Sequence, residues 1–151
     1  MRPYLNTSAL NRPFDDLSVA MVRTEADAVL LLLAEVEAGR AELVSSEYLL
    51  FEVAQTPDVD RARRVTTLLG LAKTTAKASP AVVSRAHALE RMGLRGLDAL
   101  HVASAEGGTA DLLVTTDERM LRRTRRASTQ LEIEVVTPVE ALARLLSDRD
   151  R

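Results

Sequence analysis

The chain has 151 residues, of which 46% are hydrophobic and 28% charged, and its formal net charge is -2. This length and balance indicate a single folded domain with its own hydrophobic core and exclude a disordered chain. There is no cysteine and there are two histidines, which excludes disulfides, thiolate-held metals and a three-histidine zinc site. Aromatic residues make up 3% of the chain, so a base-stacking platform of several exposed rings is not expected.

No apolar run has the length that a membrane span needs. The longest, from Ala28 to Ala34, is ended by Glu35. The N-terminus lacks the basic and apolar regions of a secretory signal, so we expect a cytoplasmic protein without membrane contact. Arginines cluster at 61–64 and again between Asp117 and Arg126. These clusters are interpreted either as solvated helix faces or as a basic rim around an acidic site.

Short β-compatible segments alternate with helical ones along the chain. Strands are expected at the Tyr4-Leu5 stretch and at 41–44, 112–114 and 132–136. Helices are expected from Thr24 through Ala38, at 47–55, at 58–70, from Pro80 to near Gly93, at 97–106, after Asp117, and after Thr137-Pro138. The pattern predicts an α/β fold with a parallel sheet of about four to five strands, flanked by helices and with a small helical lobe. One domain is expected over 1–147, followed by a frayed tail at 148–151.

Four polar side chains are expected at one edge of this sheet. Asn6 follows the first strand and Glu52 lies on the helix after the second. Asp98 lies near the start of the helix before the next strand, and Asp117 just beyond that strand. In open parallel sheets, ligands collect at the carboxyl ends of strands. Carboxylates gathered there need a compensating cation, and hard oxygen ligands suit Mg²⁺ or Mn²⁺, which favours metal-assisted phosphodiester hydrolysis.

Each acid also has a simpler interpretation as part of a helix end. Asp98 would complement the dipole of its helix, and Asp117 would be the N-cap of the basic helix that follows. Glu52 is harder to explain in this way, because an interior position on an apolar helix gives it no capping role. Glu47 is a rival for the same function, but it lies near the helix start, where capping explains it.

Three blocks of the chain resemble PIN-domain ribonucleases of the VapC toxin type. They are the opening Tyr4–Asp16, with the sequence YLNTSALNRPFDD, the segment Leu97–Ala103, with LDALHVA, and Leu113–Asp117, with LVTTD. The order and spacing of the blocks extend the resemblance over essentially the whole chain. It implies a compact parallel sheet flanked by helices, an acidic Mg²⁺ or Mn²⁺ site and endoribonuclease activity on RNA. It also implies a homodimer and a cognate antitoxin partner.

The resemblance also assigns roles by position. It implies that Glu52, Asp98 and Asp117 are catalytic acids and metal ligands, together with Asn6 as a metal ligand. Ser8 and Thr116 match hydroxyl positions that support the metal. His101 lies three residues after Asp98, and we interpret it as a packing and orienting partner rather than a ligand.

Asn6 departs from the family pattern, which has an aspartate at this position. An amide oxygen can bind a hard cation but brings no charge, and affinity for divalent ions depends on the number of carboxylates. Two hypotheses therefore stand: a metal-dependent ribonuclease toxin attenuated at Asn6, and a catalytically inactive PIN-like module that acts through antitoxin or RNA contacts. A receiver-type phosphate-responsive domain is a third, but it needs a lysine at the site, and Lys73 and Lys77 are both expected between helices.

Overall fold

The computed structural model describes residues 1–151 and contains five β-strands, eight α-helices and two 3-10 turns. The strands are β1 (Pro3–Leu5), β2 (Val44–Ser46), β3 (Thr74–Ala76), β4 (Leu112–Val114) and β5 (Glu134–Val136). The helices are α1 (Thr7–Asn11), α2 (Ala20–Glu37), α3 (Glu47–Ala54), α4 (Val59–Leu69), α5 (Pro80–Arg91), α6 (Gly96–Gly107), α7 (Glu118–Arg126) and α8 (Pro138–Arg149), and the turns are η1 (Arg12–Phe14) and η2 (Ser128–Gln130). No helix combines the length and apolar character that crossing a membrane requires.

The five strands form one parallel sheet in the order β3-β2-β1-β4-β5. Tyr4 of β1 lies opposite Val44 of β2 on one side and Leu113 of β4 on the other. The chain builds outward from β1 to β2 and β3, then returns to the other side of β1 for β4 and β5. This reversal makes the carboxyl end of β1 the switch point at which open parallel sheets bind ligands. The predicted α/β sheet of four to five parallel strands is confirmed.

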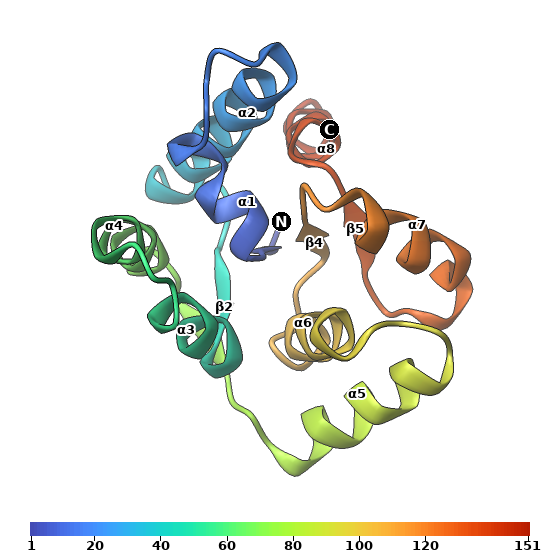
Figure 1. Cartoon of the computed structure of the whole chain (residues 1–151). Helices are drawn as coiled ribbons and strands as arrows, with labels where there is room; N and C mark the ends of the chain where they lie inside the picture. Colours follow the sequence, from blue (N-terminus) through green and yellow to red (C-terminus); the bar gives the residue numbers. More distant parts are fainter.

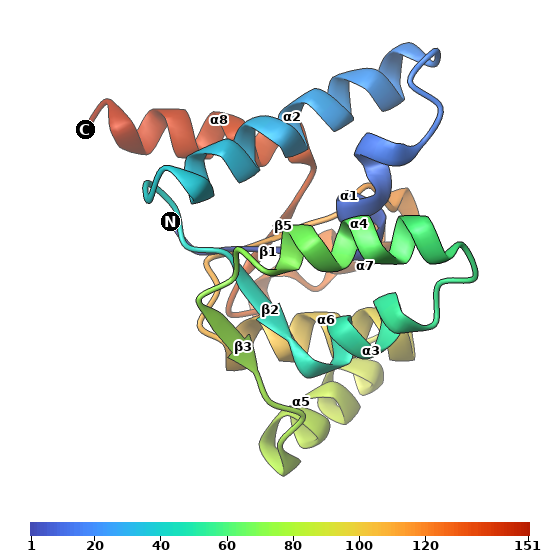
Figure 2. The ribbon, with the colours of Figure 1, turned by 90° about the vertical axis from the view of Figure 1, so that its left-hand side faces the viewer.

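Helices cover both faces of the sheet. Helices α2 and α8 pack side by side on one face, and α6 packs on the other face with α5 beyond it (Figures 1 and 2). Between the layers lies a core of Leu, Val and Ala side chains around the central strands, where Tyr4, Leu5 and Leu113 are fully or almost fully buried. The absence of Trp thus leaves the core to aliphatic packing, as the composition predicts.

Local capping signals place most of the helix ends. The hydroxyl of Ser46 accepts a hydrogen bond from the Leu49 N–H at 2.9 Å and begins α3. Asp58, Ser79 and Thr137 cap α4, α5 and α8 in the same way. Gly39 ends α2 with a φ of 78°, the left-handed conformation that glycine adopts without steric cost. These ends agree with the sequence-based prediction.

Three elements differ from the prediction. Helix α2 begins at Ala20 rather than Thr24, whose hydroxyl donates to the Ala20 carbonyl within the helix. The N-cap residue, Val19, makes no side-chain capping bond, so no local signal marks this start. Strand β3 was not predicted, and it divides the expected helical lobe into an α3–α4 pair and an α5–α6 pair. The second strand was placed at 41–44, whereas β2 occupies Val44–Ser46.

Close packing explains one of the two glycines at the carboxyl end of α6. Gly107 lies in the last helical position, and the left-handed residue is Thr109, with a φ of 57°. A side chain on Gly108 would begin 2.6 Å from Cγ1 of Val44, so close packing against β2 requires glycine there. At the C-terminus, α8 continues through Arg149, so the tail expected from residue 148 is partly helical.

Candidate functional site

Asn6 lies at the switch point and is held by bonds within the protein. Its side chain is 6% exposed and directly follows β1. The carbonyl oxygen accepts from the Ser8 hydroxyl at 2.8 Å and from the Ala9 N–H at 3.2 Å, which makes Asn6 the N-cap of α1. Its amide nitrogen donates to Thr115 Oγ1 at 2.8 Å. Both ends of the amide are therefore engaged without any ligand.

Thr115 joins the ends of β1 and β4. The residue is fully buried, and its hydroxyl oxygen also accepts from the Asp117 N–H at 3.1 Å. Ser8 lies 3.2 Å from the same hydroxyl and accepts from the Thr116 N–H at 3.1 Å. Ser8 thus holds the Asn6 side chain, and Thr116 takes part through its backbone N–H. That either hydroxyl supports a metal stays a prediction. The sequence did not single out Thr115, because only the register of β1 against β4 brings it to Asn6.

Glu52 points into a second polar cluster between α1, α3 and α6. Its Oε1 accepts hydrogen bonds from the Thr7 hydroxyl and, at 3.1 Å, from Nε2 of His101. Its Oε2 accepts from the Tyr48 hydroxyl at 3.2 Å. Burial favours a higher pKa for Glu52, but these hydrogen bonds outweigh it and hold the pKa below its ordinary value. Glu52 is therefore a carboxylate at neutral pH.

His101 holds Glu52 through a hydrogen bond, a contact that the sequence does not predict. A carboxylate only accepts hydrogen bonds, so Nε2 of His101 donates to Glu52, while Nδ1 lies 2.9 Å from the Tyr4 hydroxyl. The Tyr4 hydroxyl is in turn 2.9 Å from the oxygen of Ser46. Burial strongly raises the pKa of Tyr4, so this hydroxyl keeps its proton. Both ring nitrogens of His101 therefore take part in a buried hydrogen-bond network.

Tyr48 is a site residue that the sequence reading missed. Its ring packs edge-on against His101, with a centroid distance of 5.0 Å. Burial, together with the charges of Glu52 and Asp98, raises the pKa of Tyr48 to about 12. The hydroxyl consequently remains a donor to Glu52. An aromatic residue four positions before an acid on the same helix face is the only sequence signal for this pair.

Asp98 and Asp117 form the acidic part of the site that faces a cavity. Asp98, in the first turn of α6, lies 3.5 Å from Nη1 of Arg123 on α7. Burial raises the pKa of Asp98, and the negative charge of Asp117 adds to the increase. Asp117 caps α7, with Oδ1 accepting from the N–H groups of Arg119 and Met120. Both capping bonds use the same oxygen, which leaves Oδ2 available to a ligand.

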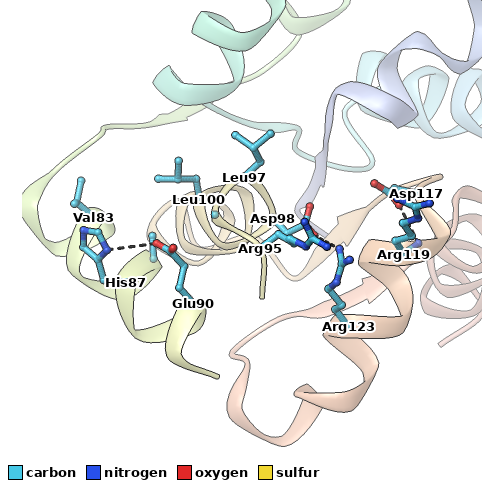
Figure 3. A pocket seen from close by; sticks show the side chains of 12 residues that line it. Val83, His87, Glu90, Arg95, Leu97, Asp98, Leu100, Asp117, Arg119 and Arg123 are labelled. Atoms are coloured by element: carbon cyan, nitrogen blue, oxygen red, sulfur yellow. Dashed lines mark hydrogen bonds and ion pairs between the residues drawn. The ribbon is translucent and has the colours of Figure 1, made fainter. Parts of the chain in front are cut away.

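A cavity of about 730 Å³ opens at this acidic pair (Figure 3). Asp98, Asp117, Arg119 and Arg123 line one end of it. Asn6 and Glu52 are not part of its lining. The structure therefore brings together two of the predicted acids at one cavity and places Glu52 in a neighbouring cluster. Glu47, the rival acid, is exposed and lines a separate cavity beside Phe51.

The donor set fits a hydrated divalent cation at the acidic pair rather than an ion enclosed by all four predicted ligands. No group of three or more His, Cys, Asp or Glu side chains is arranged to hold a metal. Mg²⁺ commonly binds through one or two carboxylates and keeps several waters, which Asp98 and Asp117 satisfy. Their mutual repulsion, only partly offset by Arg123, is the electrostatic condition that a cation would relieve.

Comparisons with known proteins bear on the fold. A scan of protein-family models and a search of curated proteins found no match. Among solved structures, PAE2754 from Pyrobaculum aerophilum superposes with a TM-score of 0.53 and 19% identity, over 97% of this chain and 90% of that chain. VapBC2 from Rickettsia felis, solved bound to a DNA fragment from its promoter, superposes with a TM-score of 0.53 and 13% identity, over 91% of this chain and 98% of that chain.

The fold is PIN-like. This confirms the fold that the resemblance of the three sequence blocks predicts. The superpositions extend over nearly the whole of this chain. At these identities the similarity concerns the fold alone. Function therefore has to be argued from the site.

Proposed function

We propose that the chain is a Mg²⁺- or Mn²⁺-dependent endoribonuclease whose activity is attenuated by Asn6. The observation that carries the proposal is the Asp98–Asp117 pair, flanked by arginines, at the cavity beside the sheet switch point. Two carboxylates are suited to a hydrated hard cation, and guanidinium groups are suited to phosphate oxygens. A PIN-like fold that presents this combination favours nuclease chemistry.

Each residue has a separate function under this proposal. Asp98 and Asp117 would hold the ion, while Arg119 and Arg123 bind the phosphodiester. A bound Mg²⁺ or Mn²⁺ would supply a water of lowered pKa and neutralise charge on the phosphate. Glu52 is fixed by His101, Thr7 and Tyr48 as a charged acceptor. It would orient water near this centre.

The catalytically inactive module is the second candidate. It is favoured by the hydrogen bonds of Asn6, which satisfy both ends of its amide, and by the absence of a three-acid metal group. Such a module would use the same cavity for binding RNA or a protein partner without cleaving RNA.

Incubation of RNA with the purified chain separates the two candidates. We expect slow cleavage in Mg²⁺ or Mn²⁺, faster cleavage by Asn6→Asp, and none in EDTA or with Asp98→Asn. Glu47→Gln is the matched control, because it removes an exposed acid that lies outside the cavity of Asp98 and Asp117. If Asn6→Asp cleaves no RNA with either ion, while circular dichroism shows it folded, the ribonuclease proposal fails and the inactive module stands.

We also propose that the chain forms a homodimer and binds a cognate antitoxin. The similarity to VapBC2 supports the antitoxin partner. Exposed apolar side chains on the paired helices α2 and α8 support an interface there. They include Leu30, Leu31 and Leu146, each about half exposed. Light scattering of the chain alone tests the dimer, and Leu31→Asp is expected to yield monomers.

A further inference from the structure

The cavity continues past the acidic pair to a second end of different chemistry. That end is lined by Val83 and His87 of α5 and by Leu97 and Leu100 of α6 (Figure 3). Leu97 is 62% exposed and Val83 is 42% exposed. Apolar side chains that line a cavity together with a few charged groups are typical of ligand-binding sites.

A polar pair stands beside these apolar side chains. Nδ1 of His87 lies 3.4 Å from Oε1 of Glu90, one turn further along α5. The Oε2 atom of Glu90 lies 3.8 Å from the point where a side chain on Gly96 would begin, so the carboxylate reaches the first turn of α6. That turn carries Asp98. The pair is thus continuous with the acidic end of the cavity.

The simpler interpretation of the His87–Glu90 pair is a surface contact without function. The chain contains such a pair on α4. Asp60 and Arg63 are also spaced i,i+3, at 3.6 Å on α4, with side chains 79% and 73% exposed. They line none of the larger cavities. The His87–Glu90 pair differs because both residues line the cavity beside exposed apolar side chains. This contrast supplies a matched control.

We propose that this end of the cavity is a subsite for one unpaired RNA base, next to the phosphate bound by Arg119 and Arg123. The inference rests on the proposed function, which places RNA at the acidic pair. Leu97 and Val83 would contact the face of the base, and the His87 ring would stack on it. Arg95, which lines the cavity between the two ends, would contact the connecting phosphate.

The carboxylate of Glu90 gives the subsite a preference between the two pyrimidine bases. A carboxylate accepts hydrogen bonds, and cytosine offers it the N4 amino group where uracil presents the O4 acceptor. The two bases share the same ring size, so they differ mainly in this edge. The subsite therefore favours a cytosine-type amino edge over uracil. The edge must also be unpaired, which makes the substrate single-stranded.

Binding in EDTA tests the subsite without cleavage. Fluorescence anisotropy at low salt would compare short cytidine and uridine oligomers on the full chain. We expect the cytidine oligomer to bind about tenfold more tightly, in line with the discrimination of a single good base contact. Glu90→Gln, whose amide both donates and accepts, should reduce this ratio to near one. His87→Ala should weaken both oligomers, and Asp60→Asn should change neither.

The outcomes separate this inference from the proposed function. If wild type binds both oligomers equally, binds neither, or keeps its ratio in Glu90→Gln, the base subsite is overturned, even if the chain cleaves RNA. If the ratio depends on Glu90 but Asn6→Asp cleaves nothing in Mg²⁺ or Mn²⁺, the subsite stands and the ribonuclease proposal fails. Circular dichroism of each variant shows that losses do not come from unfolding.

Discussion

Asn6 fills two structural roles, and an aspartate would fill them differently. Its carbonyl oxygen caps α1 and its amide donates to the buried hydroxyl of Thr115. Aspartate is an equally good N-cap, so the first role would survive substitution. The second would change, because a carboxylate cannot donate. The Thr115 hydroxyl would have to rotate to donate instead, and a charge would be placed at a position that is 6% exposed.

Asn6→Asp should therefore lower the free energy of unfolding of the metal-free chain by about 1–3 kcal/mol, the usual cost of an imperfectly satisfied buried polar group. The same change should raise the affinity for Mn²⁺, because it adds a carboxylate beside the acidic pair. Denaturant titration measures the first effect and calorimetric titration the second. Asn6→Ser is the control, since it keeps a capping oxygen but adds no charge. Equal Mn²⁺ affinity in all three proteins would place residue 6 outside the metal site.

At the scale of elements, the packing of α6 on the sheet depends on Gly108. Cγ1 of Val44 lies 2.6 Å and Cβ of Ala76 lies 3.4 Å from the position of a Cβ at residue 108. Val44 is β-branched and buried in the middle of the sheet, so its side chain has few alternative rotamers. Any added methyl group must move α6 or β2, and α6 carries Asp98 and His101.

Gly108→Ala should thus lower the free energy of unfolding by about 1–3 kcal/mol, as overpacking of a close contact usually does. For a chain of this length, each kcal/mol corresponds to a fall of about 2–4 °C in Tm. Gly96→Ala is the matched control on the same helix, because its nearest neighbour would be Glu90 Oε2 at an ordinary 3.8 Å. A control Tm that falls as far as that of Gly108→Ala would contradict the close-packing explanation.

The sequence predicts those elements whose ends carry their own signals. Ser46, Asp58, Ser79 and Thr137 each cap a helix through a local hydrogen bond, and the sequence predicts all four of these helices. The start of α2 and the short edge strand β3 carry no such signal, because Val19 makes no capping bond and β3 is defined by pairing with β2. These two elements depend on tertiary contacts, so sequence patterns did not reveal them.

The candidate site likewise has parts that local sequence signals predict and parts that depend on tertiary contacts. Glu52, Asp98 and Asp117 were found because acids after strands and on apolar helix faces stand out. Their separation into a cavity-facing pair and a hydrogen-bonded Glu52 was not predictable, since it depends on partners distant in sequence. Thr115 reaches Asn6 across the β1–β4 register, and His101 reaches Glu52 from another helix.

At the scale of the whole molecule, a net charge of -2 gives no general attraction for RNA. Binding must come from locally placed cations, and α7 supplies them. Arg119 and Arg123 line the acidic end of the cavity together with Asp98 and Asp117. The affinity for RNA should therefore depend on salt through a small number of phosphate contacts rather than through overall charge.

Replacing one of these cations should remove one phosphate contact. For single-stranded RNA, each contact contributes about 0.7 to the slope of log affinity against log salt concentration. Arg119→Gln should reduce the slope by about this amount and weaken cytidine and uridine oligomers equally, because phosphate contacts carry no base preference. Arg149→Gln changes the net charge identically but removes a cation that pairs with Glu35 on α2, away from the cavity. If both variants change the slope equally, RNA affinity depends on overall charge, and the arginines of α7 do not form a specific phosphate-binding site.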